Sequence, residues 1–351
     1  MLNTSVWSLG PHGLAVGGIT LGNNAVLTRL SELARETFLL WDQSWVDFSW
    51  RHYYYEHTQR VRALALEIGR HEAADLDKLQ YAALLHDITK RYDGKILRDS
   101  QGRRITNEYG FWRNELLMPA RENMVTRLYR EHRQFHKLHN LSGAVVAEKI
   151  LESYGLPEGF RHSIASIIEG HLKLCNGEDS SSPDVLERNI LYEADTMDAN
   201  LGLIAFYRNI HINTHNAIAT RGKADVAQYV SLIEPWIQTK VPFVKRMETA
   251  TSIQVAEQRL EKMRKIHEQI LDEARTSFAS SLEQGLLGCV KYFMEHNEDP
   301  CLEDEMSYLM TTWIPGHERA LRNGSDPEAQ AMLQRAALFC SLLTQEIQGK
   351  S

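Results

Sequence analysis

The sequence predicts an all-α fold, a helical bundle continued by further helices toward the C-terminus. Only nine prolines interrupt the 351 residues. Apolar residues recur at intervals of three and four through most of the chain, which is typical of amphipathic helices. No series of alternating strands with hairpin turns is visible, and residues 95–110 are the one segment where a short hairpin is expected.

The first helix of the central region follows His57, where Val61, Leu64, Ala65 and Ile68 repeat with i, i+3, i+4, i+7 spacing. The next begins after Asp75, which suits an N-terminal cap, and runs to His86. These two segments predict a pair of helices that each bury one face.

Three further helices are predicted downstream. One covers residues 141–155 and ends at a C-terminal glycine, Gly155. Another starts near Pro157, because proline suits a first helical position. A third is expected to be capped by Ser182, with Pro183 just inside it and Asp184 in the first turn, where a carboxylate suits the helix dipole.

The chain divides into three predicted regions. Residues 1–40 form an N-terminal arm with one short helix, residues 41–275 form the main domain, and residues 276–351 form a C-terminal helical extension. The extension contains amphipathic helices joined by an acidic linker, and we expect it to pack on the main domain or on a second subunit.

The composition argues against several classes of protein. Lys and Arg number 39 against 46 Asp and Glu, for a net charge of −7, so there is no strong nucleic-acid signal, although a local basic pocket for one phosphorylated ligand is compatible with it. The chain has no run of eighteen apolar residues, so no membrane span is expected. Scattered cysteines and the lack of a secretion signal favour a soluble, cytoplasmic protein, and a homo-oligomer is compatible with the composition.

Histidine and aspartate residues mark the ends of several predicted helices. His57, the pair His86 and Asp87, His171 and Asp195 each stand at or near the end of an apolar helix, while His139 opens one. Any single histidine is usually a surface residue or a hydrogen-bonded core residue. The joint pattern indicates more, because a buried carboxylate needs a counter-charge and imidazole with carboxylate suits Mn, Fe, Co, Ni or Zn.

The same residues carry a family resemblance. The ordered set resembles the HD-domain superfamily of metal-dependent phosphohydrolases, in the segments "EHTQRVRALALEI", "AALLHDITK", "HNLSGAVVAEKIL", "IIEGH" and "ILYEADTMDANLGLIAFYR". The similarity covers roughly residues 50–270 and implies an HD-domain helical bundle.

The resemblance also implies a ligand set for two divalent metal ions (Mn, Fe, Co, Ni, Mg or Zn). One ion would be held by His57, His86, Asp87 and Asp195, and the second by Asp87 as a bridge with His139 and His171. Two ions about 3.5–4 Å apart share a water molecule and neutralise a phosphoryl group during in-line attack.

Further charged residues are assigned by position. Lys90 lies one helical turn after His86, so with Asp87 it is the catalytic candidate and also a substrate-binding one; a C-terminal helix charge that offsets the dipole is the alternative. Arg60 and Arg208 are weaker candidates, either for phosphate binding or for support of the ligands. Asp198 is expected to orient a ligand histidine or to be a solvated helix residue.

Two ligand assignments keep an alternative, His52 for His57 and His136 for His139. Between Lys90 and His139, a group of basic and aromatic residues could form a lid, although a plain insertion with a solvated basic face is favoured. These residues are Arg103, Arg104, Tyr109, Phe111, Trp112 and Arg113.

The function expected from these features is hydrolysis of a phosphate ester or anhydride, with a nucleotide or a related small phosphorylated metabolite as substrate. Two alternatives stay open. Relatives with a similar six-ligand set hold two irons and use oxygen to cleave a carbon bond, and a third class binds a nucleotide without catalysis and passes the signal to a partner.

Overall fold

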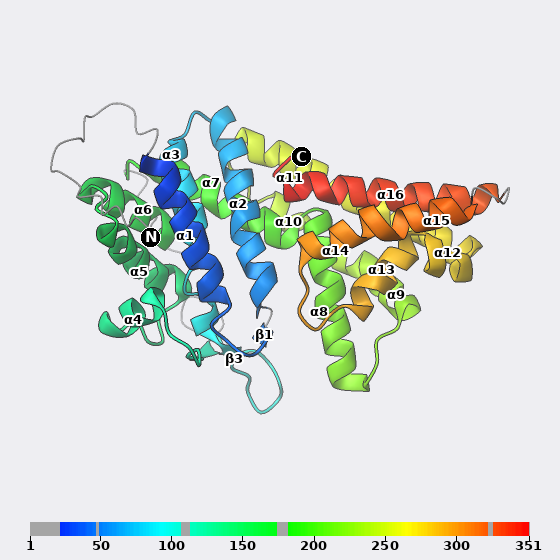
Figure 1. Cartoon of the computed structure of the whole chain (residues 1–351), viewed down its shortest axis with the longest axis horizontal. Helices are drawn as coiled ribbons and strands as arrows, with labels where there is room; N and C mark the ends of the chain where they lie inside the picture. Colours follow the sequence, from blue (N-terminus) through cyan, green and yellow to red (C-terminus); the bar gives the residue numbers. More distant parts are fainter. Residues whose placement is uncertain (1–21, 47–48, 107–112, 174–181, 322–325, 351) are drawn as a thin grey trace, which may run out of the picture.

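The computed structural model describes residues 22–46, 49–106, 113–173, 182–321 and 326–350, and it confirms the all-α class (Figure 1). The first half contains α1 (Gly22–Phe38), α2 (Arg51–His71), α3 (Leu76–Leu85), α4 (Met124–Glu131), α5 (His139–Ser153), α6 (Glu158–Gly170) and α7 (Val185–Asn200). The second half contains α8 (Leu203–Arg221), α9 (Val226–Gln238), α10 (Val241–Val244), α11 (Ala250–Thr276), α12 (Phe278–Gln284), α13 (Leu286–Glu295), α14 (Leu302–Tyr308), α15 (Ile314–Leu321) and α16 (Pro327–Ile347).

Two pairs of very short antiparallel strands accompany the helices. The pair β3 (Lys95–Ile96) and β4 (Asn114–Glu115) confirms a hairpin in the expected place, but its second strand lies beyond residue 110. The pair β1 (Trp45–Val46) and β2 (Ser49–Trp50) was not predicted. A 3₁₀ turn (Lys90–Asp93) and a π turn (Leu309–Trp313) complete the elements of the described residues.

The helices that surround the candidate site are α2, α3, α5, α6 and α7. α2 packs on α3 and α7, and α6 packs on α3, α5 and α7. Val61, Leu64, Ala65 and Ile68 all lie buried on one face of α2, as their spacing predicts. The Asp75 carboxylate accepts a hydrogen bond from the Lys78 amide, so the expected cap of α3 is present. α3 ends at Leu85, and His86 and Asp87 therefore stand at the inner end of a core helix.

The predicted helix from Pro183 onward is wrong in two respects. It begins at Val185, with Asp184 rather than Ser182 at the N-cap position, and the Asp184 carboxylate accepts from Lys78 Nζ at 2.7 Å instead of from a backbone amide of the helix. The predicted segment, residues 181–210, is also interrupted after Asn200, where Gly202 adopts φ +95° and the chain turns into α8. A positive φ is readily adopted only by glycine, so Gly202 separates the helix of Asp195 from the helix of Arg208.

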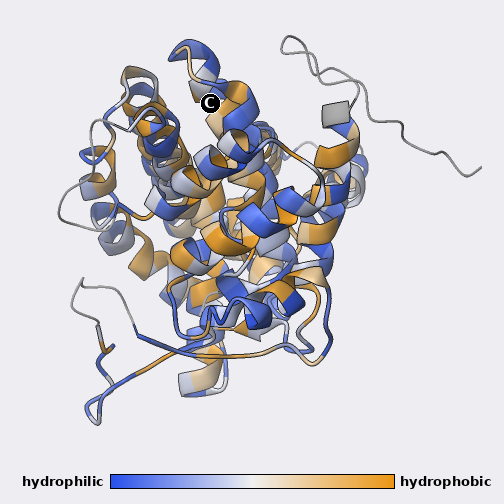
Figure 2. Ribbon diagram, turned by 90° about the vertical axis from the view of Figure 1, so that its left-hand side faces the viewer, coloured by the Kyte–Doolittle hydropathy of each residue, from blue (hydrophilic) through white to orange (hydrophobic). Residues whose placement is uncertain are grey.

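The C-terminal helices pack on α8, α9 and α11, so the extension covers the main domain of its own chain. One hydrophobic core runs from Leu27 on α1 to Leu343 on α16 without a gap. Most helices carry hydrophilic and hydrophobic residues together, as amphipathic helices do (Figure 2). The boundaries at residues 40 and 275 remain predictions, because the core continues across both.

Four buried glutamates connect helices that are distant in sequence. Each accepts a backbone N–H near the start of another helix, where such groups have no intrahelical partner. The donors are Leu302 and Glu303 of α14 for Glu56, Thr249 before α11 for Glu193, Leu286 of α13 for Glu273, and Leu203 and Ile204 of α8 for Glu346. These carboxylates fix the positions of the helices that cover the core.

The structure also bears on two expectations from composition. Cys289, Cys301 and Cys340 are free thiols, while Cys175 lies outside the described residues. Among the helices that the structure describes, none has both the length and the apolar character to cross a membrane.

Replacement of Glu346 tests the role of these glutamates in stability. Its carboxylate lies 2.7 Å from the Leu203 amide and 3.3 Å from the Ile204 amide, in fully buried surroundings. We expect Glu346→Ala to lower the free energy of unfolding by about 2–3 kcal/mol, because two buried donors lose their acceptor. Glu346→Gln keeps one acceptor oxygen, so its free energy of unfolding should fall by less. Urea denaturation measures both, and equal, negligible losses would contradict the assignment.

Candidate metal centre

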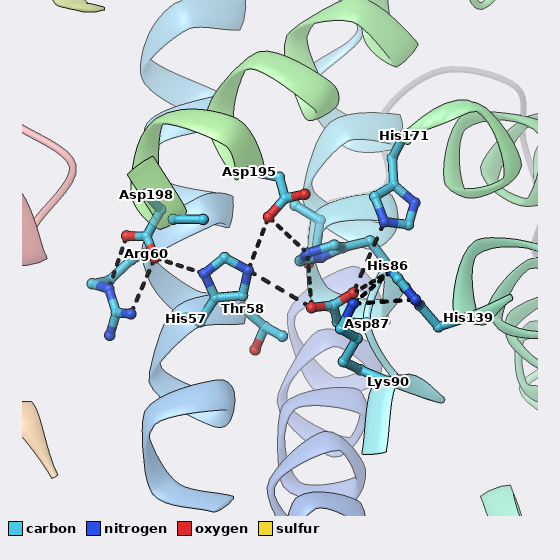
Figure 3. A network of polar contacts seen from close by, with 12 residues as sticks. His57, Thr58, Arg60, His86, Asp87, Lys90, His139, His171, Asp195 and Asp198 are labelled. Carbon is cyan, nitrogen blue, oxygen red and sulfur yellow. Dashed lines mark hydrogen bonds and ion pairs between the residues drawn. The ribbon is translucent and has the colours of Figure 1, made fainter. Parts of the chain in front are cut away.

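Asp87 stands at the centre of a group of buried histidines (Figure 3). His86 and Asp87 directly follow α3, and α5 approaches them closely because residue 143 is glycine. A Cβ atom at Gly143 would lie 3.2 Å from the His86 carbonyl oxygen, closer than most Cβ contacts. The absence of a side chain at Gly143 therefore allows His139, at the start of α5, to reach Asp87.

The two oxygens of Asp87 face two different sets of imidazoles. Oδ2 lies 3.7 Å from His57 Nε2 and 3.7 Å from His86 Nε2. Oδ1 lies 3.4 Å from His139 Nε2 and 3.9 Å from His171 Nε2. The potential ligand atoms thus form two buried groups that share Asp87, one with His57 and His86 and the other with His139 and His171.

Asp195 joins the first group from α7. Its Oδ1 lies 3.1 Å from His57 Nε2 and 3.9 Å from His86 Nε2. The Asp195 side chain is 20% exposed, against 6% or less for the other five residues. Asp195 is therefore the most solvent-exposed member of the group.

The polar atoms left without partners fit a metal ion. His86 and His171 each direct Nδ1 to a carbonyl oxygen, of Ala83 at 2.7 Å and of Ile168 at 2.6 Å. Within the described part of the chain, the opposite Nε2 atom of each ring is buried without a hydrogen-bond partner. Buried polar atoms are normally paired, and an imidazole whose Nδ1 proton is held by a carbonyl presents Nε2 as a ligand.

The protonation of His171 and of Asp87 also suits cation binding. Burial, together with His86 and His139, lowers the pKa of His171 to about 3, so its ring is neutral at pH 7 and able to bind a metal. Burial would raise the pKa of Asp87, but His86, His139 and Lys90 outweigh it and hold that pKa far below its usual value. Asp87 is therefore a carboxylate that needs positive charge around it.

His57 is oriented from behind by Asp198. Its Nδ1 lies 2.6 Å from Asp198 Oδ2, and the Arg60 guanidinium donates to both oxygens of Asp198 at 2.9 and 3.1 Å. Burial lowers the pKa of His57, but Asp195 and Asp198 outweigh it and raise the pKa to about 9. Of the two roles considered for Arg60, these contacts favour support of a ligand over phosphate binding, because the guanidinium is buried and already engaged.

Asp93 is a site residue that the sequence analysis missed. Its Oδ2 lies 2.7 Å from His139 Nδ1, so it orients the ring of His139 as Asp198 orients the ring of His57. Lys90 Nζ lies 3.2 Å from Nδ1 and 3.3 Å from Nε2 of the same ring. The sequence shows an acidic residue shortly after "HDITK", but it does not show that the 3₁₀ turn at Lys90–Asp93 brings this residue next to His139.

The two alternative ligand histidines do not join the group. His136 is exposed with φ +61°, and His52 lies 3.5 Å from Asp299 at the surface of α2.

Two arginines singled out from the sequence are engaged elsewhere. Arg208, on α8, donates to the Ala199 carbonyl oxygen at 3.3 Å and is only partly buried. Arg103 is exposed and paired with Asp99, as in a plain insertion.

The remaining residues of the suggested lid are placed differently. Tyr109, Phe111 and Trp112 lie outside the described residues. Arg104 forms an antiparallel bridge with Arg98, and Arg113 lines a cavity of about 210 Å³ beside Asp93.

Part of the chain is similar to a known family of domains. Residues 54–200 match the model of the HD domain. A comparison with curated proteins finds no match.

Among solved structures, a predicted HD superfamily hydrolase from an uncultured Thermotogales bacterium is 22% identical and covers 70% of this chain and 92% of its own, with a TM-score of 0.38. YpgQ of Bacillus subtilis in complex with ADP is 18% identical and covers 74% and 100%, with a TM-score of 0.39. Lin1889 of Listeria innocua is 15% identical and covers 72% and 98%, with a TM-score of 0.41.

The match to the HD-domain model, over residues 54–200, spans the segment that carries the six converging side chains.

Proposed function

We propose that the protein is a metal-dependent phosphohydrolase that hydrolyses a phosphate ester or anhydride of a nucleotide or a related small phosphorylated metabolite. One observation carries the proposal. Asp87 is shared by two buried groups of potential ligands, and two histidine nitrogens in these groups have no partner within the described residues. The HD-domain match over residues 54–200 supports it.

Each of the six side chains has a role in this proposal. His57, His86, Asp87 and Asp195 hold one divalent ion, and Asp87, His139 and His171 hold the other. When bound, a pair of ions (Mn, Fe, Co, Ni, Mg or Zn) activates a water molecule at neutral pH and neutralises phosphoryl oxygens. The residues behind the ligands, Asp198 and Asp93, fix the rings of His57 and His139.

Lys90 is the proposed catalytic cation. Burial lowers its pKa, but Asp87 and other acidic neighbours outweigh this and raise it, so the side chain stays an ammonium in the buried site. An ammonium held beside the ligands offers donors to the phosphoryl oxygens that gain charge during the reaction.

The substrate class rests on the same charges. Lys90 and the partly buried Arg208, which also bonds to Tyr54, provide positive charge for an anionic substrate in a chain whose net charge is negative. Arg208 is therefore kept as a proposed substrate-binding residue. A small substrate agrees with the limited exposure of the group. The cytoplasmic location and an oligomeric state stay predictions from composition.

The ligand assignment predicts a stoichiometry. Wild-type protein should bind two divalent ions per chain, His171→Ala should bind one, and Asp87→Ala should bind none, because only Asp87 belongs to both groups. Titration calorimetry with Mn²⁺, with elemental analysis of the dialysed protein, measures this. Unchanged metal content in Asp87→Ala would contradict the site.

The reaction is tested by phosphate release. We expect Mn²⁺-, Co²⁺-, Ni²⁺- or Mg²⁺-loaded protein to release phosphate or pyrophosphate from at least one member of a nucleotide and sugar-phosphate panel, and Asp87→Ala to release none. A metal-loaded protein that turns over no substrate but binds a nucleotide tightly would instead be a sensor. Iron in aerobically purified protein, with oxygen consumption, would favour the oxygenase.

Lys90→Met separates catalysis from metal binding. We expect kcat to fall about 10²–10³-fold, the loss typical when one transition-state donor is removed. The metal content should stay at two ions, because Lys90 is not a ligand. Lys149→Met removes an exposed lysine and serves as the control. A Lys90→Met enzyme with full kcat would leave Lys90 with the alternative role of a helix-end charge.

A further inference from the structure

The start of α14, in the C-terminal extension, is bound by the residue that precedes His57. Glu56 Oε2 accepts from the Leu302 amide and Oε1 from the Glu303 amide, both at 3.0 Å, and Cys301 Sγ lies 3.3 Å from Oε1. Glu56 is buried on α2. A buried carboxylate is stable only with such donors, so Glu56 and the first turn of α14 fix each other.

Arg60 connects this contact to the ligand group. Its Nη1 lies 3.7 Å from Glu56 Oε2, while Nε and Nη2 donate to Asp198, and Asp198 in turn lies 2.6 Å from His57 Nδ1. All four side chains are buried. The guanidinium is therefore held between two carboxylates, one that binds α14 and one that orients His57 (Figure 3 shows the Arg60–Asp198–His57 part).

Other residues of the same segment strengthen the attachment of α14. Asp299, just before α14, accepts from Arg51 Nε at 2.7 Å, at the start of α2. Glu305, within α14, lies 3.7 Å from the buried His211 on α8. Residues 299–305 thus contact both α2 and α8.

We propose that α14 is a positioning element of the metal centre and that Glu56 is the positioning residue through which it acts. This rests on the proposed metal site. With Glu56 fixed by α14, its charge holds Arg60 in the geometry that binds both oxygens of Asp198. Without it, the buried guanidinium loses one of its two counter-charges and shifts, so the His57 ring loses its fixed orientation.

Glu56→Ala tests the proposal against a closely matched control, Glu273→Ala. Glu273 is also a buried glutamate that accepts from the first turn of an extension helix, with Arg335 Nη1 3.8 Å away. Among the described residues, no hydrogen bond or ion pair joins it to His57 or to a neighbour of His57. Co²⁺ affinity by calorimetry and the visible absorption spectrum of the Co²⁺-loaded protein are the readouts, with urea denaturation to compare stability.

We expect Glu56→Ala to lower the affinity for Co²⁺ about 10-fold or more, the usual effect of losing support behind a ligand, and to change the Co²⁺ spectrum. Glu273→Ala should lose similar stability with unchanged affinity and spectrum. Unchanged Co²⁺ binding by Glu56→Ala, or equal losses in both variants, would overturn the proposal. Wild-type protein that binds no metal would instead overturn the metal site itself.

A double-mutant cycle identifies the route. In an Arg60→Met background, Glu56→Ala should lower the Co²⁺ affinity by less than 2-fold further, because the connection is already broken. Fully additive losses would mean that Glu56 acts by another path and would contradict the role of Arg60. Should Glu56→Ala fail to fold, Glu56→Gln takes its place, since it keeps an acceptor for α14 and removes only the charge that faces Arg60.

Discussion

The burial of the Asp87 carboxylate among four imidazoles is the constraint on which the site depends. An ionised group taken from water into a protein interior costs several kcal/mol unless opposite charge surrounds it. Here the neighbours are Lys90 and histidines whose Nε2 atoms point at the carboxylate, and two of those atoms have no partner among the described residues. A site of this kind is costly for folding and is explained by the ions that we propose it binds.

The surrounding helices hold each of the four imidazole rings through a hydrogen bond to its Nδ1 atom. Backbone carbonyls hold His86 and His171, while carboxylates hold His57 and His139. The same device, a buried acid with a fixed set of donors, recurs farther out, where glutamates bind the first turns of α8, α11, α13 and α14. The C-terminal helices therefore share one core with the candidate metal centre, and the contact of Glu56 with Arg60, at 3.7 Å, connects them to it.

The sequence predicted the parts that depend on local pattern. Spacing alone located α2 and α3. The helix-end positions indicated a metal site, and the resemblance to the HD-domain superfamily implied the full ligand set, His57, His86, Asp87, His139, His171 and Asp195. It did not locate Asp93, because a carboxylate in a loop has no periodicity and only the turn after Lys90 brings it to His139. It also missed the break at Gly202, since the apolar pattern continues from α7 into α8.

The long-range contacts were the least predictable. Glu56, Glu193, Glu273 and Glu346 are ordinary residues in their own helices, and their partners lie on other helices, so only the packed structure pairs each acid with its donors. Arg60 shows the same limit. The sequence left phosphate binding and ligand support open for Arg60, and the contact with Asp198, on another helix, favours the second.

The most direct test of the account is a crystal structure of the Mn²⁺-loaded protein with anomalous scattering measured at the manganese edge. The account predicts two anomalous peaks on either side of the Asp87 carboxylate, one near His57, His86 and Asp195 and one near His139 and His171. Clear density for all six side chains with no peak beside Asp87 would contradict it.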